Sequence, residues 1–354
     1  MEKYASSPIL LSRKIWILTK HFYSTKGTRL TKKLCIGYFT FLTSFIFPIY
    51  ASAQLSTQQQ VAKLQGIKLF NQHKKAEHEL RIAAEAGDTE AQFYLAEELR
   101  QQTITLNAEA LQWYEAAATQ GDLYSMIRIG RTDNDLCLTM KNCPIGKKEP
   151  KEWLAEATRI AKDKSDRGDA EALYIMYELT AEREWLKKSA LAGDAIAQYR
   201  MAIGDRQGEG FILPWKRQEI VEHWFLLSAK AGNPKAMMQL FGIYREKGEL
   251  EQARYWVEKA ASIGYEAGVY NYGYFLAVDP KALGFTEDKI KGYALISLLK
   301  ELDGGGAAQT DVEETLPQIS EKMTPTQIQE AEDFATKWKT THPPLSFFPE
   351  KIGF

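Results

Sequence analysis

The stretch ARYWVEKAASIGY, residues 253–265, holds a tryptophan, a small residue four positions later and a glycine eight positions after the tryptophan. The same arrangement occurs in ALQWYEAAATQGD (110–122), EREWLKKSALAGD (182–194) and EHWFLLSAKAGN (222–233). Residues 152–169 carry a lengthened copy, and residues 77–88 carry one without the tryptophan. Steps of four residues place these positions on one face of a helix. The sequence therefore predicts a recurring helix that ends at each glycine, with these columns: Trp113, Trp153, Trp185, Trp224 and Trp256, then Gly87, Gly121, Gly168, Gly193, Gly232 and Gly264.

A second helix is predicted after each glycine. A small residue follows four positions on and an apolar residue eight positions on, and an Asp or Asn directly after most of the glycines can cap this helix. Successive tryptophans lie 32 to 40 residues apart, which is typical of stacked helical hairpins. We therefore predict an all-α fold, a right-handed α/α superhelix, in which the tryptophans and glycines are structural residues.

The pattern Trp-x-x-x-Ala-x-x-x-Gly-Asp/Asn-x-x-Ala resembles the Sel-one-like repeat, a relative of the tetratricopeptide repeat. The resemblance covers residues 61–302, about seven units of the length typical for such repeats. It implies an α-solenoid that acts as an adaptor or binding scaffold without chemistry of its own. One secreted, cysteine-rich branch of the family ties every repeat with a disulfide and is linked to penicillin binding. This chain departs from that branch, so that activity is not expected here.

The first 53 residues differ from the rest of the chain. They contain basic residues, an apolar run over 34–50 and the small residues Ala51-Ser52-Ala53, in the order of a secretory signal peptide. We expect cleavage after Ala53 and a periplasmic protein, the alternative being an uncleaved N-terminal anchor. Residues 1–53 hold eight Lys or Arg and one acid, so the remainder has 37 basic and 45 acidic residues and a net charge of −8. This charge disfavours nucleic acids and anionic membranes as partners.

Two cysteines remain after the leader, Cys137 and Cys143, in the segment CLTMKNC. In an oxidising compartment they can form a small disulfide, and the alternative is a pair of free thiols. A zinc site needs four ligands, and neither a histidine nor a further cysteine lies nearby, so no metal site is expected.

Beyond the repeats the chain divides into two further parts. We assign residues 54–302 to the solenoid and residues 303–340 to capping helices that close its open end. The last segment, 341–354, is an apolar tail that either folds back or stays loose.

Catalytic motifs are missing from the sequence. It contains neither HExxH, nor a Gly-x-Ser-x-Gly elbow, nor a phosphate-binding loop. Adjacent acids such as Glu97 and Glu98 are interpreted as solvated helix faces. We therefore expect a chain that is not an enzyme and needs no cofactor.

The remaining candidate site is the inner face of the solenoid. In tetratricopeptide-type arrays the helix after each glycine lines the concave side, and the seventh residue after a glycine is mostly polar here. These residues are Tyr94, Arg128, Arg200, Gln239 and Asn271. Tyr and Arg contribute strongly to protein interfaces, so this column predicts a groove for a protein segment; the alternative is a merely solvated face.

Three functions follow from these observations. The resemblance permits an immunity protein that neutralises a secreted antibacterial effector, such as a type VI lipase, by direct binding. A second possibility is a periplasmic adaptor that assembles envelope proteins or senses cell-wall material. The third is a hydrolase that acts on β-lactams or on the cell wall. The sequence does not decide the oligomeric state.

Overall fold

Pairs of antiparallel helices follow one another along the chain in a computed structural model that describes residues 55–102, 107–132, 148–210, 213–302 and 307–352. The leader with Ala53, and Cys137 and Cys143 with their expected disulfide, lie outside the described residues. Tyr50–Phe354 forms a compact unit by itself. In the described part the secondary structure is helical, apart from one isolated β-bridge between Tyr265 and Ser346. The fold class is thus an all-α repeat fold.

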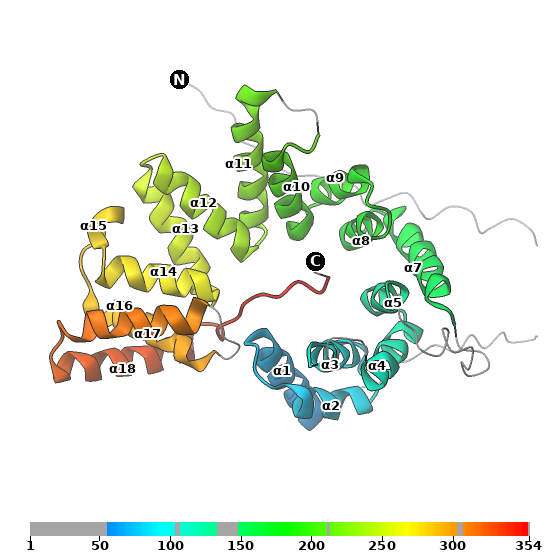
Figure 1. Cartoon of the computed structure of the whole chain (residues 1–354), viewed down its shortest axis with the longest axis horizontal. Helices are drawn as coiled ribbons and strands as arrows, with labels where there is room; N and C mark the ends of the chain where they lie inside the picture. The colour runs from blue at the N-terminus through cyan, green and yellow to red at the C-terminus, as the bar shows by residue number, and fades with distance from the viewer. Residues whose placement is uncertain (1–54, 103–106, 133–147, 211–212, 303–306, 353–354) are drawn as a thin grey trace, which may run out of the picture. The chain divides into compact units, whose positions relative to one another are not determined.

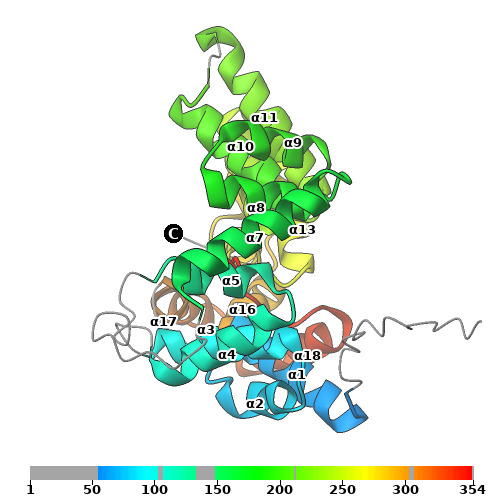
Figure 2. The ribbon, with the colours of Figure 1, turned by 90° about the vertical axis from the view of Figure 1, so that its right-hand side faces the viewer.

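The first half of the repeat region extends along an arc (Figure 1). Its helices are α1 (Thr57–Asn71), α2 (Glu77–Glu85), α3 (Thr89–Gln101), α4 (Ala108–Thr119), α5 (Leu123–Gly130), α7 (Pro150–Ser165), α8 (Ala170–Thr180) and α9 (Arg183–Leu191). Figure 2 looks onto α7 and α8, from which the chain continues through α5 and α4 in one direction and through α9 in the other.

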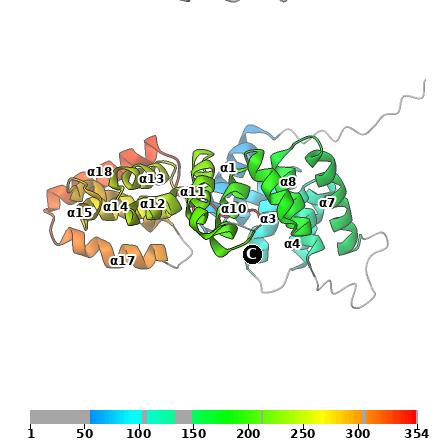
Figure 3. The same cartoon turned by 90° about the horizontal axis from the view of Figure 1, so that it is seen from above.

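The second half begins at α10 and ends in the C-terminal helices. These are α10 (Ala195–Gln207), α11 (Pro214–Lys230), α12 (Pro234–Glu246), α13 (Leu250–Ser262), α14 (Glu266–Ala277), α15 (Pro280–Leu283), α16 (Lys289–Leu298), the 3₁₀ turn η1 (Leu299–Glu301), α17 (Ala307–Ser320) and α18 (Pro325–Thr341). Both α17 and α18 pack on α16, at the end of the array. Figure 3 shows α10 and α11 between the later helices of this half, from α12 onwards, and the helices α3, α4, α7 and α8.

Polar caps start the helix that follows five of the six repeat glycines, whereas Tyr265 after Gly264 makes no side-chain cap. In the five capped helices a side-chain oxygen accepts a hydrogen bond from the backbone N–H three residues on, which satisfies one of the unpaired donors of a helix N-terminus. The capping residues are Asp88, Asp122, Asp169, Asp194 and Asn233. The caps fix where each hairpin turns and so set the spacing of the stack.

The recurring small residues and tryptophans lie between neighbouring hairpins. Ala117, Ser189, Ser228 and Ala260, each four positions after a tryptophan, are fully buried. Trp153, Trp224 and Trp256 are buried as well, whereas Trp113 and Trp185 are partly exposed beside the cores that they contact. The indoles of this column therefore contribute packing rather than a solvent-facing site. By contrast Trp215, outside the column, is 74% exposed.

Candidate protein-binding site

The C-terminal tail, residues 343–352, runs across the inside of the arc (Figure 1). Of the two alternatives left by the sequence, the structure shows the folded-back one: Leu345 and Ser346 are each 8% exposed and Ile352 is 4% exposed. The tail is extended apart from a left-handed residue at Phe348, and it contacts helices that are far apart in the sequence. The inner face is therefore occupied by the chain itself.

Backbone hydrogen bonds hold the first part of the tail. The Ser346 N–H donates to the carbonyl of Gly264 at 2.9 Å, and the Ser346 carbonyl accepts from the N–H of Glu266 at 3.2 Å. This is the parallel β-bridge noted above. On the other side the Phe347 N–H donates to the carbonyl of Asn71 at 2.9 Å, at the end of α1. The tail thus joins the first helix to the start of α14.

Aromatic side chains secure the same stretch. The Phe347 ring stacks on His73 with centroids 4.2 Å apart, and the Phe348 ring meets Tyr265 edge to face at 5.9 Å. Gln72, buried at the end of α1, donates from Nε2 to the carbonyl of Leu345 at 3.1 Å. The backbone of Phe348 is left-handed, with a φ of +48°, and the two neighbouring rings reach different segments, one just after α1 and one at the start of α14.

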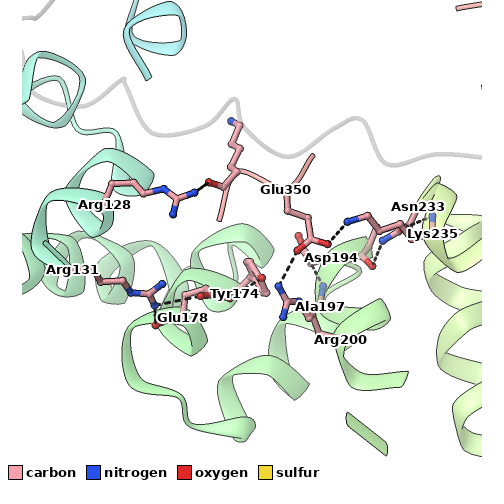
Figure 4. Close-up of polar contacts among 12 residues, drawn as sticks. Arg128, Arg131, Tyr174, Glu178, Asp194, Ala197, Arg200, Asn233, Lys235 and Glu350 are labelled. Atoms are coloured by element: carbon pink, nitrogen blue, oxygen red, sulfur yellow. Dashed lines mark hydrogen bonds and ion pairs between the residues drawn. The ribbon is translucent and has the colours of Figure 1, made fainter. Parts of the chain in front are cut away.

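Two basic side chains hold the carboxylate of Glu350 (Figure 4). Arg200 Nη2 on α10 lies 2.9 Å from Oε2, and Lys235 Nζ on α12 lies 2.9 Å from Oε1. Burial raises the pKa of Glu350, but the hydrogen bond from Lys235 and the charges of Lys235 and Arg200 outweigh it, and the pKa is lowered. The carboxylate is therefore held ionised.

The next two residues contact α5. The Lys351 ammonium lies 5.1 Å from the centroid of the Tyr124 ring, and the Lys351 carbonyl accepts from Arg128 Nη2 at 3.1 Å. Tyr124 donates its hydroxyl proton to Glu171 at 2.7 Å, and burial together with this carboxylate raises the pKa of the phenol. Ile352 packs into the apolar cluster that includes residues of α5 and α8.

A pocket of about 430 Å³ remains between the tail and the helices. Tyrosines from three successive inner helices line it, namely Tyr94, Tyr124 and Tyr174, together with Ile196 and Pro234. Burial raises the pKa of Tyr94 to about 12, so this phenol stays neutral. The pocket is of the size and apolar character that accept a side chain or a small ligand.

The column predicted as the inner face divides into two groups. Arg128 and Arg200 contact the tail directly, and Tyr94 lines the pocket beside it. Gln239 accepts a hydrogen bond from Arg206, and Asn271 donates to the carbonyl of Ala267 within its own helix. The structure thus places three of the five residues beside the tail and gives the other two local contacts.

The interpretation of Glu97 as a solvated acid is wrong. Glu97 is 4% exposed and accepts hydrogen bonds from the Tyr114 hydroxyl at 2.7 Å and from Arg128 Nε at 2.6 Å. Its other oxygen pairs with Arg100 at 2.8 Å. Glu97 therefore holds the guanidinium of Arg128 in place beside the tail.

Several residues of the site were missed at the sequence level. Asn71, His73, Lys235, Tyr265 and Glu350 stand outside the seventh-position column. Lys235 and Tyr265 offered one signal, because they lie within three residues after a repeat glycine, where the chain enters an inner helix. The tail residues have no periodic pattern that would assign them to a surface.

The described residues offer no metal site. Among the described residues, His, Cys, Asp and Glu side chains form no group of three or more that could hold a metal ion. In the same residues no helix is long and apolar enough to cross a membrane. The arrangement around the tail is instead one of backbone donors and acceptors, paired charges and aromatic rings, which are the elements of peptide recognition.

Comparison with known proteins gives structural neighbours of the repeat class. The chain matches no protein-family model and no curated protein. It is similar to a protective antigen of uropathogenic Escherichia coli that displays an SLR fold, with 19% identity and a TM-score of 0.44, over 81% of this chain and 62% of the antigen. It is also similar to a Sel1 repeat protein from Oxalobacter formigenes, with 21% identity and a TM-score of 0.37, over 69% of this chain and 99% of that protein. The chain thus spans less than two thirds of the antigen.

Proposed function

We propose that this chain is a protein-binding scaffold that holds an extended segment of one partner protein on its inner face. The observation that carries the proposal is the tail itself. An extended segment already lies on this surface and is held there by backbone hydrogen bonds, ion pairs and ring contacts. A surface that binds one extended chain in this way provides the contacts that a partner segment needs.

The chemistry of the site supports a peptide over other ligands. Gly264, Glu266 and Asn71 offer backbone atoms to the main chain of the bound segment, which a nucleic acid cannot use in this way. Arg200 and Lys235 then recognise a side chain. The proposed scaffold does not turn over a substrate, in line with the catalytic motifs that the sequence lacks.

The exported location belongs to the same proposal. It is supported by the order of basic, apolar and small residues in 1–53. Within this proposal the partner is a secreted antibacterial effector, and the chain is its immunity protein. The support for that step is the family resemblance of the repeats.

Co-expression with the product of the adjacent gene tests both the binding scaffold and the immunity role. The full chain should form a complex with that product and rescue cells from its toxicity. The variant R200E K235E should lose the complex, whereas the matched variant K187E, on an exposed position of α9, should keep it. Circular dichroism should show that both variants are folded.

Each outcome decides a separate point. A complex that survives R200E K235E would mean that the partner binds outside the inner face. A complex without toxicity in the partner would remove the immunity role and leave the scaffold. The absence of both a complex and a rescue would contradict the immunity role. The deletion phenotype of the gene under envelope stress would then test the adaptor.

A further inference from the structure

The tail carries a charge pattern that matches the inner face residue by residue. Glu350 is followed directly by Lys351, and their side chains reach different helices. The acid meets the basic pair Arg200 and Lys235, and the base lies over the ring of Tyr124. An extended segment with these two charges in the opposite order would bring like charges together at the basic pair.

We propose that the tail is a built-in copy of the partner's binding segment. The inner face selects an extended segment in which an acidic residue is directly followed by a basic one, and such a segment displaces the tail. This inference rests on the proposed function, because it names the chemistry of the partner and the way in which access to the same site is controlled.

The acid is recognised by position as well as by charge. Arg200 and Lys235 come from different helices and each contacts a different oxygen of Glu350 at 2.9 Å. The side chain of Glu350 is only 16% exposed. Charge pairs that are shielded from water discriminate strongly against a neutral or like-charged side chain.

The base is recognised on the opposite side of the segment. Lys351 lies over Tyr124, whose hydroxyl is bound to Glu171. The Lys351 charge also acts on Asp122, the cap of α5. An ammonium above an aromatic ring with carboxylates nearby is stabilised both by the ring quadrupole and by the negative charge.

The backbone contacts add affinity without adding sequence preference. Ser346 and Phe347 bond through main-chain atoms, so any extended segment can replace them. Selectivity must therefore come from side chains: the rings of Phe347 and Phe348, the acid and the base, and the apolar Ile352, which is 4% exposed.

The tail leaves room that a partner can use. The pocket of about 430 Å³ beside residues 348–352 is lined by tyrosines of the inner helices and is not filled by the tail. A partner segment with a larger apolar side chain would bury more surface there, which favours exchange for the tail. The tail thus holds the site against weak binders and yields to a better-fitting segment.

A peptide assay tests the proposal without the natural partner. The probe is a fluorescein-labelled peptide with the sequence of residues 343–354, PPLSFFPEKIGF, and a control peptide has the charges exchanged, PPLSFFPKEIGF. Both are titrated against the full chain and against its variant E350K, with fluorescence anisotropy as the readout. Hydrogen exchange at the Ser346 and Phe347 amides reports release of the tail. The variant E350Q serves if E350K fails to fold.

We expect E350K to expose both amides and to bind the probe at least roughly 10-fold more tightly than the wild type, because the wild-type tail competes at an effective concentration in the millimolar range. The control peptide should bind E350K roughly 10-fold or more weakly than the probe. E350Q should change amide exchange and probe affinity in the same direction as E350K, but by less. The wild type should bind the probe weakly, because its own tail occupies the site.

Four results would overturn the proposal. The first is protected amides in both variants, and the second is open amides without probe binding. The third is equal binding of the two peptides, which would remove the charge selection. The fourth is a wild-type chain that is a dimer in light scattering and becomes a monomer in E350K, which would make a second copy of this chain the occupant. Because the assay contains no partner, its failure leaves the co-expression test of the scaffold unaffected.

Discussion

Gly264 offers a quantitative test of how closely the tail is bound. Its φ is +79°, and a Cβ at this position would lie 2.5 Å from the Pro344 carbonyl oxygen. Gly193 occupies the equivalent turn with a φ of +99°, but a Cβ there would meet no atom within 4 Å. The pair G264A and G193A therefore separates the contact with the tail from the cost of the turn.

Both variants lose folding free energy because alanine replaces a glycine with a positive φ. An alanine in the left-handed region loses about 1–2 kcal/mol of folding free energy relative to glycine. Only G264A adds a steric conflict with backbone atoms of the tail, which overpacking data place at about 1–3 kcal/mol. The conflict can be relieved if the tail moves away, so the extra cost has the free energy of tail docking as its upper limit.

Urea unfolding monitored by circular dichroism measures the two losses, and hydrogen exchange at the Ser346 amide reports the tail. We expect G193A to lose about 1–2 kcal/mol with the amide still protected. G264A should lose more and should expose the amide, because the Ser346 N–H donates to the carbonyl of Gly264 itself. Equal losses with equal protection would refute the contact between the tail and the turn, and with it the folded-back tail.

Three further predictions concern the site and the core. Because the pKa of Glu350 is lowered below 4.5, docking should be complete above about pH 4.5 and weaken as the pH falls through the lowered pKa, measured as loss of Ser346 amide protection after correction for the intrinsic exchange rate. W256A should cost about 3–5 kcal/mol in urea unfolding because its indole is buried, whereas W215A, at an exposed indole, should change stability by less than about 0.5 kcal/mol. E97A should cost about 3–5 kcal/mol, because Arg128 and Tyr114 lose their buried partner; an unchanged unfolding midpoint would contradict the buried network.

The hairpins could be predicted from the sequence because each one follows from local rules that are repeated. The spacing from Trp256 to Gly264 reflects one helix face, and an acid such as Asp194 after a glycine caps the next helix. These interactions join residues within a few turns of each other. Repetition of the pattern along the chain then distinguishes it from chance.

The occupant of the inner face could not be predicted in the same way. The contact between Arg128 and the Lys351 carbonyl spans 223 positions, and the contact between Arg200 and Glu350 spans 150. The tail has neither helical nor strand periodicity, so no pattern assigns it to a partner surface. Glu97 was misjudged for a related reason: its adjacent acid suggested solvent, whereas two of its partners, Tyr114 and Arg128, come from other helices that only the fold brings beside it.

The tail also changes what the repeat architecture means for binding. In an array of hairpins each unit packs mainly on its neighbours, so a perturbation at one end reaches the other end only through all the units between them. Here Asn71 at the end of α1 and Gly264 before α14 bond to adjacent residues of one extended segment. A partner that displaces the tail removes this direct connection as it gains the site. Binding at the inner face is therefore coupled to the contact between distant repeats, and the free energy of that contact sets how tightly a partner must bind to replace the tail.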